Sequence, residues 1–323
     1  ASGPVPYEKA KAIYEKELKG KLAKGYQYAP GVSGKVFDFG AASEGSAHVS
    51  ATMPAAKKTT GIIPQLLQPD TEDDIEPYFT DPDYCAQEKK DGIRLVVDTH
   101  GSEPEGTNKK GVAIQLSPVV AANVTALGQP VTIDSEAIGD TLHVFGLLRS
   151  NGRDLKTQPY SKVIAELSRL LASHGGNGVR LIETAFTEQE KRALYAKLKE
   201  EKKEGIVFKS LSSAYNASRS AAQVKIKFYE TASVVVLGAN DKSSVRIGLF
   251  LADGDPTSDL VPVGNVTIPQ GRTIPPQFSV IEVRYLYAYR GGSLFQTTFL
   301  NVREDLDPAD CWIGQLKYRA EEE

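Results

Sequence analysis

Lys89-Lys90-Asp91-Gly92-Ile93-Arg94 is the most informative stretch of this 323-residue chain. It places a lysine beside an Asp-Gly turn, with an arginine two residues beyond the glycine. A free lysine has a pKa of about 10.4, so it is protonated and a poor nucleophile at neutral pH. Burial and neighbouring cations favour the neutral amine. The stretch therefore predicts a nucleophile at Lys89; a surface turn between two strands is the alternative.

The composition is that of a soluble globular protein with room for two domains. Hydrophobic residues make up 41% and charged residues 24% of the chain. No apolar run approaches the roughly 18 residues of a membrane span, so we expect no membrane partner. The two cysteines, Cys85 and Cys311, exclude a disulfide framework and a cysteine zinc site, and they suit a reducing compartment. We interpret Cys85 as a small buried residue rather than a reactive thiol.

The net charge of the chain neither identifies nor excludes nucleic acid as a partner. The net charge is −3 and the pI is near 6.0, which argues mildly against nucleic acid. Lysines crowd residues 9–24, however, while residues 70–74 and 321–323 are acidic. A local basic surface therefore remains open.

The chain divides into three regions by pattern. Residues 1–61 hold an amphipathic helix at 7–24 and a small, polar linker. Residues 62–229 alternate apolar runs with helical patterns, which is typical of an α/β or α+β domain. Residues 230–323 hold five β-rich runs, which favour a small barrel such as the OB fold over a plain β-sandwich. The predicted strands are 93–97, 131–138, 142–148, 205–208, 233–237, 245–251, 263–268, 281–289 and 294–302, and the predicted helices of the two larger regions are 162–171 and 188–201.

A strand at Val131–Ile138 carries two carboxylates, Asp134 and Glu136, on one face. Ile133 and Ala137 point to the other face. Two acids on a half-buried strand are costly unless they meet a hydroxyl, a cation or a metal. The alternative is an exposed edge strand.

Two further positions suit nucleotide chemistry. Phe145 lies on the next strand and could present its ring to a base, although filling the core is the alternative. Glu204 precedes the apolar strand at 205–208, which suits a carboxylate that holds Mg²⁺ beside phosphates.

Lys225 and Lys227 alternate with Val224 and Ile226, so both lysines share one face of a strand. Two like charges side by side repel and call for an anion, for which a phosphate is the natural candidate. An exposed edge strand protected by lysines is the alternative.

The order K-x-D-G-x-R, D-x-E, V-F-x-L-L, E-G-I-V-x-K and K-x-K, followed by a β-rich region, resembles the ATP-dependent DNA ligases of the covalent nucleotidyltransferase superfamily. The resemblance covers about residues 62–323. It implies an α+β fold, with a nucleotidyltransferase (ATP-grasp-like) adenylation domain at 62–229 and a five-stranded OB-fold β-barrel at 230–323. The short helical N-terminal extension, ending Lys24-Gly25-Tyr26, is similar to the tail of a WGR-type module.

The resemblance also implies roles for matching residues. Lys89 would carry AMP as a phosphoramidate. Gln87 and Glu88 would lie at the nucleotide, with Gln87 facing the adenine, and Phe145 would stack on the base. The other nucleotide-binding residues would be Arg94 and Glu136 at the ribose, Lys225 and Lys227 at the phosphates, and Arg303 at the pyrophosphate. Glu204, with Glu136, would hold the metal.

As substrates and cofactors, the resemblance implies ATP, Mg²⁺ or Mn²⁺, and nicked duplex DNA, with RNA-containing strands as an alternative. We expect a monomer in the cytoplasm of a bacterial or phage-infected cell that acts in DNA repair or replication. Asn108, Lys109 and Arg219 are the candidate DNA contacts.

The chain departs from the ligase pattern at several positions. Leu306 stands where the family's last motif usually ends in lysine, and Lys317 is a candidate substitute. Ser135, Gly146 and Gln223 replace a usual glycine, aspartate and tryptophan. The alternatives in function are an mRNA-capping guanylyltransferase, an RNA ligase, and an inactive nucleic-acid-binding module.

Overall fold

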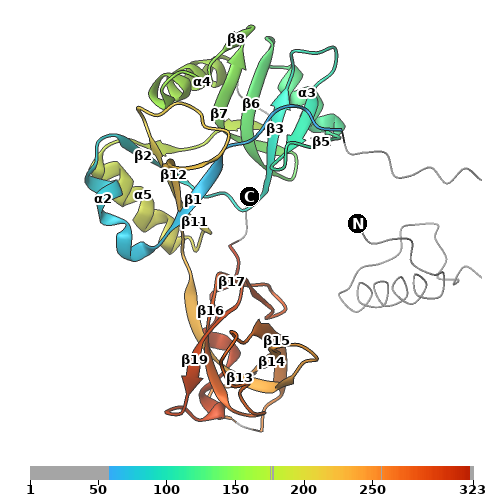
Figure 1. The fold of residues 1–323 in the computed structure, drawn as a ribbon, viewed down its shortest axis with the longest axis vertical. Helices are drawn as coiled ribbons and strands as arrows, with labels where there is room; N and C mark the ends of the chain where they lie inside the picture. Colours follow the sequence, from blue (N-terminus) through green and yellow to red (C-terminus); the bar gives the residue numbers. More distant parts are fainter. Residues whose placement is uncertain (1–57, 175, 177, 256, 321–323) are drawn as a thin grey trace, which may run out of the picture. The chain divides into compact units, whose positions relative to one another are not determined.

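The structure is a computed structural model that describes residues 58–174, 176, 178–255 and 257–320 (Figure 1). These residues belong to one unit, Ala56–Glu323. The predicted helix at 7–24 and its WGR-type resemblance lie outside the described residues. No described helix has the length and apolar character needed to cross a membrane.

A first sheet combines strands that are far apart in the sequence. Its order is β1 (Leu66–Asp70), β12 (Arg219–Lys227), β11 (Gly205–Ser210), β2 (Tyr84–Glu88) and β10 (Thr184–Ala185). β11 is antiparallel to both β12 and β2, whereas β1 is parallel to β12. The helices α2 (Glu76–Thr80) and α5 (Glu188–Glu200) pack beside β2 and β11. The core between them is aromatic, with Phe79 and Phe208 at its centre.

A second sheet has the order β5 (Ala113–Ile114), β4 (Glu105–Asn108), β3 (Ile93–Asp98), β6 (Val131–Ile138), β7 (Thr141–Ser150) and β8 (Arg153–Asp154). β9 (Val179–Leu181) pairs with β7. The helices α3 (Pro118–Thr125) and α4 (Tyr160–His174) contribute to its apolar core. Each fully buried Leu, Ile or Val of this core contributes about 1.5–3 kcal/mol.

The C-terminal part is an antiparallel sheet in the order β15 (Leu260–Thr267), β14 (Ser244–Phe250), β13 (Glu230–Ala239), β16 (Val280–Tyr285) and β19 (Thr298–Arg303). A small hairpin pairs β17 (Tyr287–Ala288) with β18 (Leu294–Phe295). Within the described residues no ladder joins β15 to β19, so the sheet is not a closed barrel. The short 3-10 helices are Glu72–Asp74, Pro308–Asp310 and Ile313–Gln315.

The strands and helices predicted within the described residues are confirmed, except that two predicted strands are each divided: 281–289 into β16 and β17, and 294–302 into β18 and β19. The sequence reading missed several short elements, among them α2, α3, β1 and β2. α3 had a usable signal, because Ser117 caps it by accepting from the Val120 amide and Pro118 opens its first turn. The alternation on β12 is also confirmed: Val224 and Ile226 are buried, and the lysines between and after them are half-buried.

Candidate active site

Lys89, Glu204 and Lys227 lie at the same end of three neighbouring strands of the first sheet, β2, β11 and β12. Lys89 follows β2, and its backbone amide donates to the carbonyl of Gly205 over 2.9 Å. Glu204 directly precedes β11, and Gly205 lies opposite Lys227 on β12. Residues more than a hundred positions apart in the sequence are therefore adjacent because of strand pairing.

Glu204 joins the two lysines. One carboxylate oxygen accepts a hydrogen bond from Lys89 Nζ, and the other lies 2.6 Å from Lys227 Nζ. Lys225, two residues before Lys227, adds a third cation. Its pKa is lowered, first by burial and then by the charges of Lys227 and Lys89. Glu204 thus pairs with two ammonium groups and lies near a third, so a polyphosphate would meet positive charge that Glu204 does not neutralise.

Both motif glycines are required by close backbone approach. A Cβ on Gly92 would lie 2.3 Å from the carbonyl oxygen of Ala137, and one on Gly205 would lie 2.2 Å from that of Ile226. No side chain fits at these distances. The glycines of K-x-D-G and E-G-I-V-x-K therefore allow the strands that carry Lys89 and Glu204 to approach their neighbours.

Arg94 pairs with Asp134 rather than with Glu136. Arg94 lies opposite Glu136 across β3 and β6. Its guanidinium nevertheless binds Asp134 through two hydrogen bonds, Nε to Oδ1 at 2.5 Å and Nη2 to Oδ2 at 2.6 Å. Asp134 thus meets a cation, one of the partners that buried acids need.

Glu136 is the second carboxylate near Lys89. Burial raises its pKa to about 7, and the charges of Arg94 and Lys89 oppose that rise. Within the described residues its side chain has no hydrogen bond or ion pair. It is therefore free to accept a bond from a ligand hydroxyl or to bind a cation.

A cavity adjoins Lys89 between the two sheets. Its polar and aromatic lining residues are Gln87, Glu88, Lys89, Lys90, Arg94, Glu136, Phe145, Lys209 and Gln223. One carboxylate oxygen of Glu88 lies 2.5 Å from Lys90 Nζ. The other is buried without a partner in the described structure, so the wall offers an unused acceptor.

Phe145 separates this cavity from a second one. It is the extra residue of a β-bulge, because Asp134 lies opposite Gly146 whereas Ser135 lies opposite Val144. Bulges of this kind re-aim a side chain next to functional sites. The Arg94 guanidinium carbon lies 4.6 Å from the centroid of the Phe145 ring. The family's aspartate is absent at Gly146, where a Cβ would lie 3.0 Å from the Asp134 Cβ.

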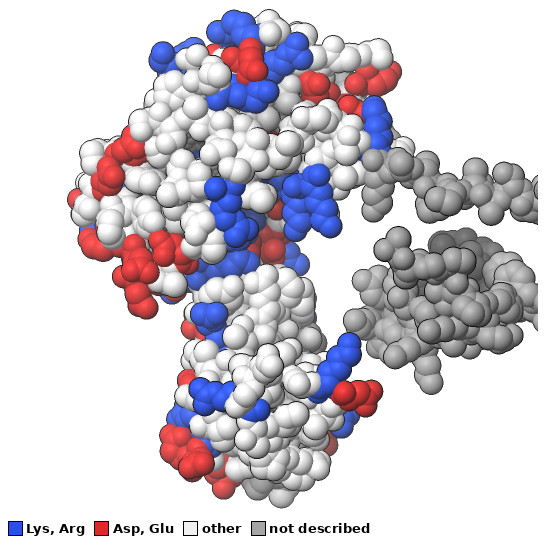
Figure 2. All heavy atoms as spheres, viewed as in Figure 1, with Lys and Arg blue, Asp and Glu red and all other residues white. Residues whose placement is uncertain are grey.

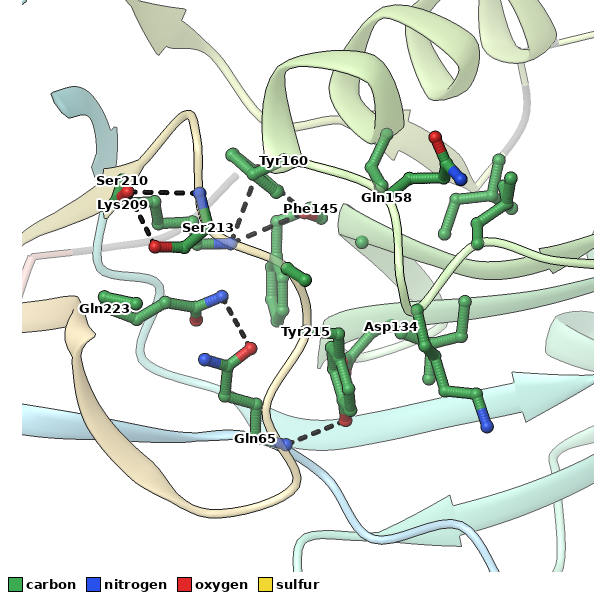
Figure 3. Close-up of a pocket in the computed structure, with 18 of the residues that line it drawn as sticks. Gln65, Asp134, Phe145, Gln158, Tyr160, Lys209, Ser210, Ser213, Tyr215 and Gln223 are labelled. Atoms are coloured by element: carbon green, nitrogen blue, oxygen red, sulfur yellow. Dashed lines mark hydrogen bonds between the residues drawn. The ribbon is translucent and has the colours of Figure 1, made fainter. Parts of the chain in front are cut away.

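The second cavity has a polar wall (Figure 3). Gln223, which stands where the resemblance expects tryptophan, donates to Gln65 Oε1 over 3.0 Å. The backbone N–H of Gln65 donates to the Tyr215 hydroxyl over 2.8 Å. Lys209 reaches this wall from β11, with Nζ 4.3 Å from the Phe145 ring centroid.

Lys209 and Tyr160 are residues to which the sequence reading gave no function. Lys209 had a weak signal, since it is the one charged side chain on the otherwise apolar strand β11. Tyr160 follows Pro159 in a pair similar to a ligase segment, but that similarity assigned no role to its hydroxyl. The structure places both around Phe145.

A cationic groove leads away from Lys89. The candidate DNA contacts Asn108, Lys109 and Arg219 all line it. Its charged lining residues are Lys89, Arg94, Lys109, Lys110, Arg219, Lys225 and the single carboxylate Glu136. Figure 2 shows basic side chains gathered on this face around β1 and β12. The groove suits a polyanion, although the chain as a whole is slightly acidic.

The structure does not bring Arg303 to this cavity. Its guanidinium makes two hydrogen bonds of 2.7 Å to Asp305 and lies 3.9 Å from Glu282. Leu306 packs against the C-terminal core. Lys317 donates to the Phe228 carbonyl over 2.7 Å, so its ammonium is also engaged elsewhere.

Cys85 is fully buried beside the site, and burial raises the pKa of its thiol to about 11. The thiol is thus a small core group, as the sequence indicated. His143 is half-buried, and its pKa is lowered to about 4, mainly by burial. The described residues contain no cluster of three or more potential metal ligands.

Comparison with solved structures shows which proteins share this fold. A Lig E DNA ligase aligns with a TM-score of 0.56 at 17% identity, over 75% of this chain and 100% of its own. The protein named Pmar-Lig_Pre aligns with a TM-score of 0.57 at 13% identity, over 74% of this chain and 67% of its own. The ligase domain of M. tuberculosis LigD covers 77% of this chain and 97% of its own at 20% identity, with a TM-score of 0.46. The chain shares its fold with the Lig E DNA ligase and with Pmar-Lig_Pre.

Neither the protein-family models nor the curated proteins contain a match to this sequence. At 13–17% identity the structural likeness to the Lig E ligase and to Pmar-Lig_Pre establishes the fold alone. The activity has to be argued from the site itself.

Proposed function

We propose that this protein is an ATP-dependent DNA ligase that seals nicks between a 5′-phosphate and a 3′-hydroxyl. The observation that carries the proposal is the meeting of Lys89, Glu204 and Lys227 beside a cavity lined by polar and aromatic side chains. The cationic groove that begins at the same lysine supports a nucleic-acid substrate. The ligase fold agrees with both.

The proposed reaction has three steps. Lys89, once it has lost a proton, attacks the α-phosphorus of ATP; a P–N bond forms and pyrophosphate leaves. The 5′-phosphate of the nick then attacks the lysine-bound AMP, which frees the amine and forms a phosphoanhydride. Finally the 3′-hydroxyl attacks that 5′-phosphate, a phosphodiester forms, and AMP leaves.

Different residues around Lys89 would contact different parts of the nucleotide. Lys225 and Lys227 would hold the phosphates, since they supply charge that Glu204 only partly neutralises. Gln87 and Glu88 would contact the base.

The ring of Phe145 would stack on the base, and Arg94 with Glu136 would hold the ribose. In the ligand-free arrangement Arg94 is engaged by Asp134. Glu136 is therefore the better-placed acceptor for a ribose hydroxyl.

Mg²⁺ or Mn²⁺ fits the residues present. Such ions are commonly held by one or two carboxylates together with substrate phosphates, and Glu204 and Glu136 both border the region of Lys89. When bound, the ion would supply positive charge to the phosphates. The lysines that now neutralise Glu204 would then be available to the nucleotide.

We further propose an adenylation domain at 62–229 and an OB-fold domain at 230–323. The strand order β15-β14-β13-β16-β19 is that of a five-stranded barrel opened between its end strands, and β15 and β19 lie near one another. Arg303 would orient the pyrophosphate. To do so, it would first have to break its ion pair with Asp305.

Intact-mass analysis tests the first step. The protein is incubated with Mg²⁺ and, separately, ATP, GTP or NAD⁺, alongside Lys89→Ala and the control Lys162→Ala, a substitution at an exposed site on α4. We expect an AMP adduct from ATP in the wild type and the control, and none in Lys89→Ala. A GMP adduct would favour a capping enzyme. No adduct from any donor, in protein not already adenylylated, would overturn the proposal.

The acceptor is tested on labelled nicked duplexes. One duplex has DNA on both sides of the nick and the other has RNA on both sides. We expect the joined product chiefly from DNA. Joining of the RNA substrate alone would make the protein an RNA ligase.

A further inference from the structure

The amide of Gln87 is held by two hydroxyl groups. Gln87 is the last residue but one of β2, close to Lys89, and it is almost fully buried in the wall of the cavity that adjoins Lys89. Its Nε2 donates to the Tyr160 hydroxyl and to the Thr184 hydroxyl, each over 2.9 Å. Thr184 lies directly opposite Gln87 on the neighbouring strand β10, and Tyr160 opens α4.

Each of the two hydroxyl groups donates its only proton to a backbone carbonyl. The Tyr160 hydroxyl donates to the Phe145 carbonyl over 2.8 Å, and the Thr184 hydroxyl donates to the Ile182 carbonyl over 3.1 Å. Burial raises the pKa of the Tyr160 phenol well above its usual value, so the phenol keeps its proton. A carbonyl can only accept, and each hydroxyl has only one proton. Both hydroxyls therefore act as acceptors toward Gln87.

This arrangement decides which end of the amide faces the hydroxyls. The nitrogen of Gln87 must point at Tyr160 and Thr184, and both of its N–H groups are used there. A flipped amide would need the hydroxyl protons for its own oxygen, and the buried carbonyl of Ile182 would lose its donor. Lys209 Nζ, 3.4 Å from the Tyr160 oxygen, adds a second donor to that oxygen.

With its nitrogen held by the two hydroxyls, the Gln87 side chain turns its carbonyl oxygen Oε1 toward the cavity. It has no hydrogen-bond partner in the described part of the chain, and it is not one of the sealed, unpartnered buried atoms. An acceptor at this position favours a base that offers a hydrogen-bond donor. Adenine offers the N–H groups of its 6-amino substituent, whereas guanine presents a 6-oxo acceptor that would face another acceptor.

We propose that Tyr160 and Thr184 are positioning residues that fix the Gln87 amide with Oε1 toward the cavity, and thereby select a 6-aminopurine nucleotide over a 6-oxopurine nucleotide. The inference rests on the proposed function for its placement of the base. It adds the residues that set base selectivity, neither of which touches the base.

Equilibrium binding tests the inference without requiring any reaction. Calorimetry without divalent metal gives the dissociation constants of ATP and GTP for the wild type, Tyr160→Phe, Thr184→Val and the double variant. We expect the wild type to prefer ATP. In the variants the amide is free to turn its nitrogen toward the cavity, so ATP should bind more weakly and GTP more tightly.

The expected change is a fall in the ATP-over-GTP preference of about tenfold or more in the double variant. Thr184→Ser keeps the hydroxyl and should keep the preference. Tyr195→Phe is the matched control, since it removes a tyrosine hydroxyl that donates to Glu72 and does not line the cavity. A purely structural role would weaken both nucleotides equally and leave the ratio unchanged.

The outcomes separate this inference from the proposed function. An unchanged ratio in the double variant overturns the inference, even if the wild type forms an AMP adduct. Binding of neither nucleotide, or no preference in the wild type, also overturns it. A preference for ATP that collapses in the variants, in a protein that forms no adduct, supports the inference and removes the ligase proposal.

Discussion

Lys209 should make the stability of this protein depend on pH in the alkaline range. Its side chain is only 3% exposed. Nζ has two long contacts, each 3.4 Å, to the Phe145 carbonyl and the Tyr160 hydroxyl, and no carboxylate pairs with it among the described residues. Burial, followed by the positive charge of Arg94, lowers the pKa of this lysine to about 7.

The magnitude follows from the difference in pKa between the folded and unfolded states. The unfolded chain holds the proton below pH 10.5, whereas the folded protein holds it only below about pH 7. Between these values the unfolded state binds more protons, so the free energy of unfolding rises with pH. The slope is about 1.4 kcal/mol per pH unit, and the total is about 5 kcal/mol. This stability is fully present above pH 10.5 and is lost as the pH falls to 7.

Urea denaturation of the wild type and Lys209→Met from pH 6 to 9.5 checks the reasoning. Methionine fills similar space without a charge, so we expect the variant to be more stable at pH 6. Its advantage should shrink by about 1.4 kcal/mol for each pH unit above 7. Lys162→Met, at an exposed site on α4, should show no such trend. A difference between wild type and Lys209→Met that stays constant with pH would refute the argument.

Three further predictions concern the site and the groove. Asp134→Asn leaves the partly buried Arg94 guanidinium without its charge partner, and it should lower the free energy of unfolding by about 3 kcal/mol in urea. Lys227→Met removes a cation from the phosphate-facing edge, and it should slow formation of the AMP adduct by about a hundredfold in an intact-mass time course. Replacing Lys109 and Arg219 by alanine should weaken DNA binding. It should also reduce the slope of log K against log salt by about 2, measured by fluorescence anisotropy.

Each of these predictions has a contrary outcome. A loss below about 1 kcal/mol in Asp134→Asn, similar to that of the exposed Asp73→Asn, would mean that water solvates Arg94. An unchanged adduct rate in Lys227→Met would remove that lysine from the phosphate site. A salt slope equal to that of the wild type would show that DNA does not follow the groove.

Local pattern was sufficient for much of the fold. The alternation on β12 predicted a strand with Val224 and Ile226 buried behind two lysines, because side chains alternate between the faces of any strand. The same reasoning placed Asp134 and Glu136 together on β6. It could not pair the strands, since pairing depends on contacts between distant parts of the chain.

The sequence by itself determined the types of residue available for the chemistry and their order along the chain, including the turn that carries Lys89. Only the tertiary structure decided which charges meet: Arg94 with Asp134, and Glu204 with two lysines. It also decided that Lys209 is buried and that Arg303 lies apart from the cavity. The physical reason is that side-chain direction follows from the local backbone, whereas ion pairing, burial and pKa follow from the packing of strands brought together from across the sequence.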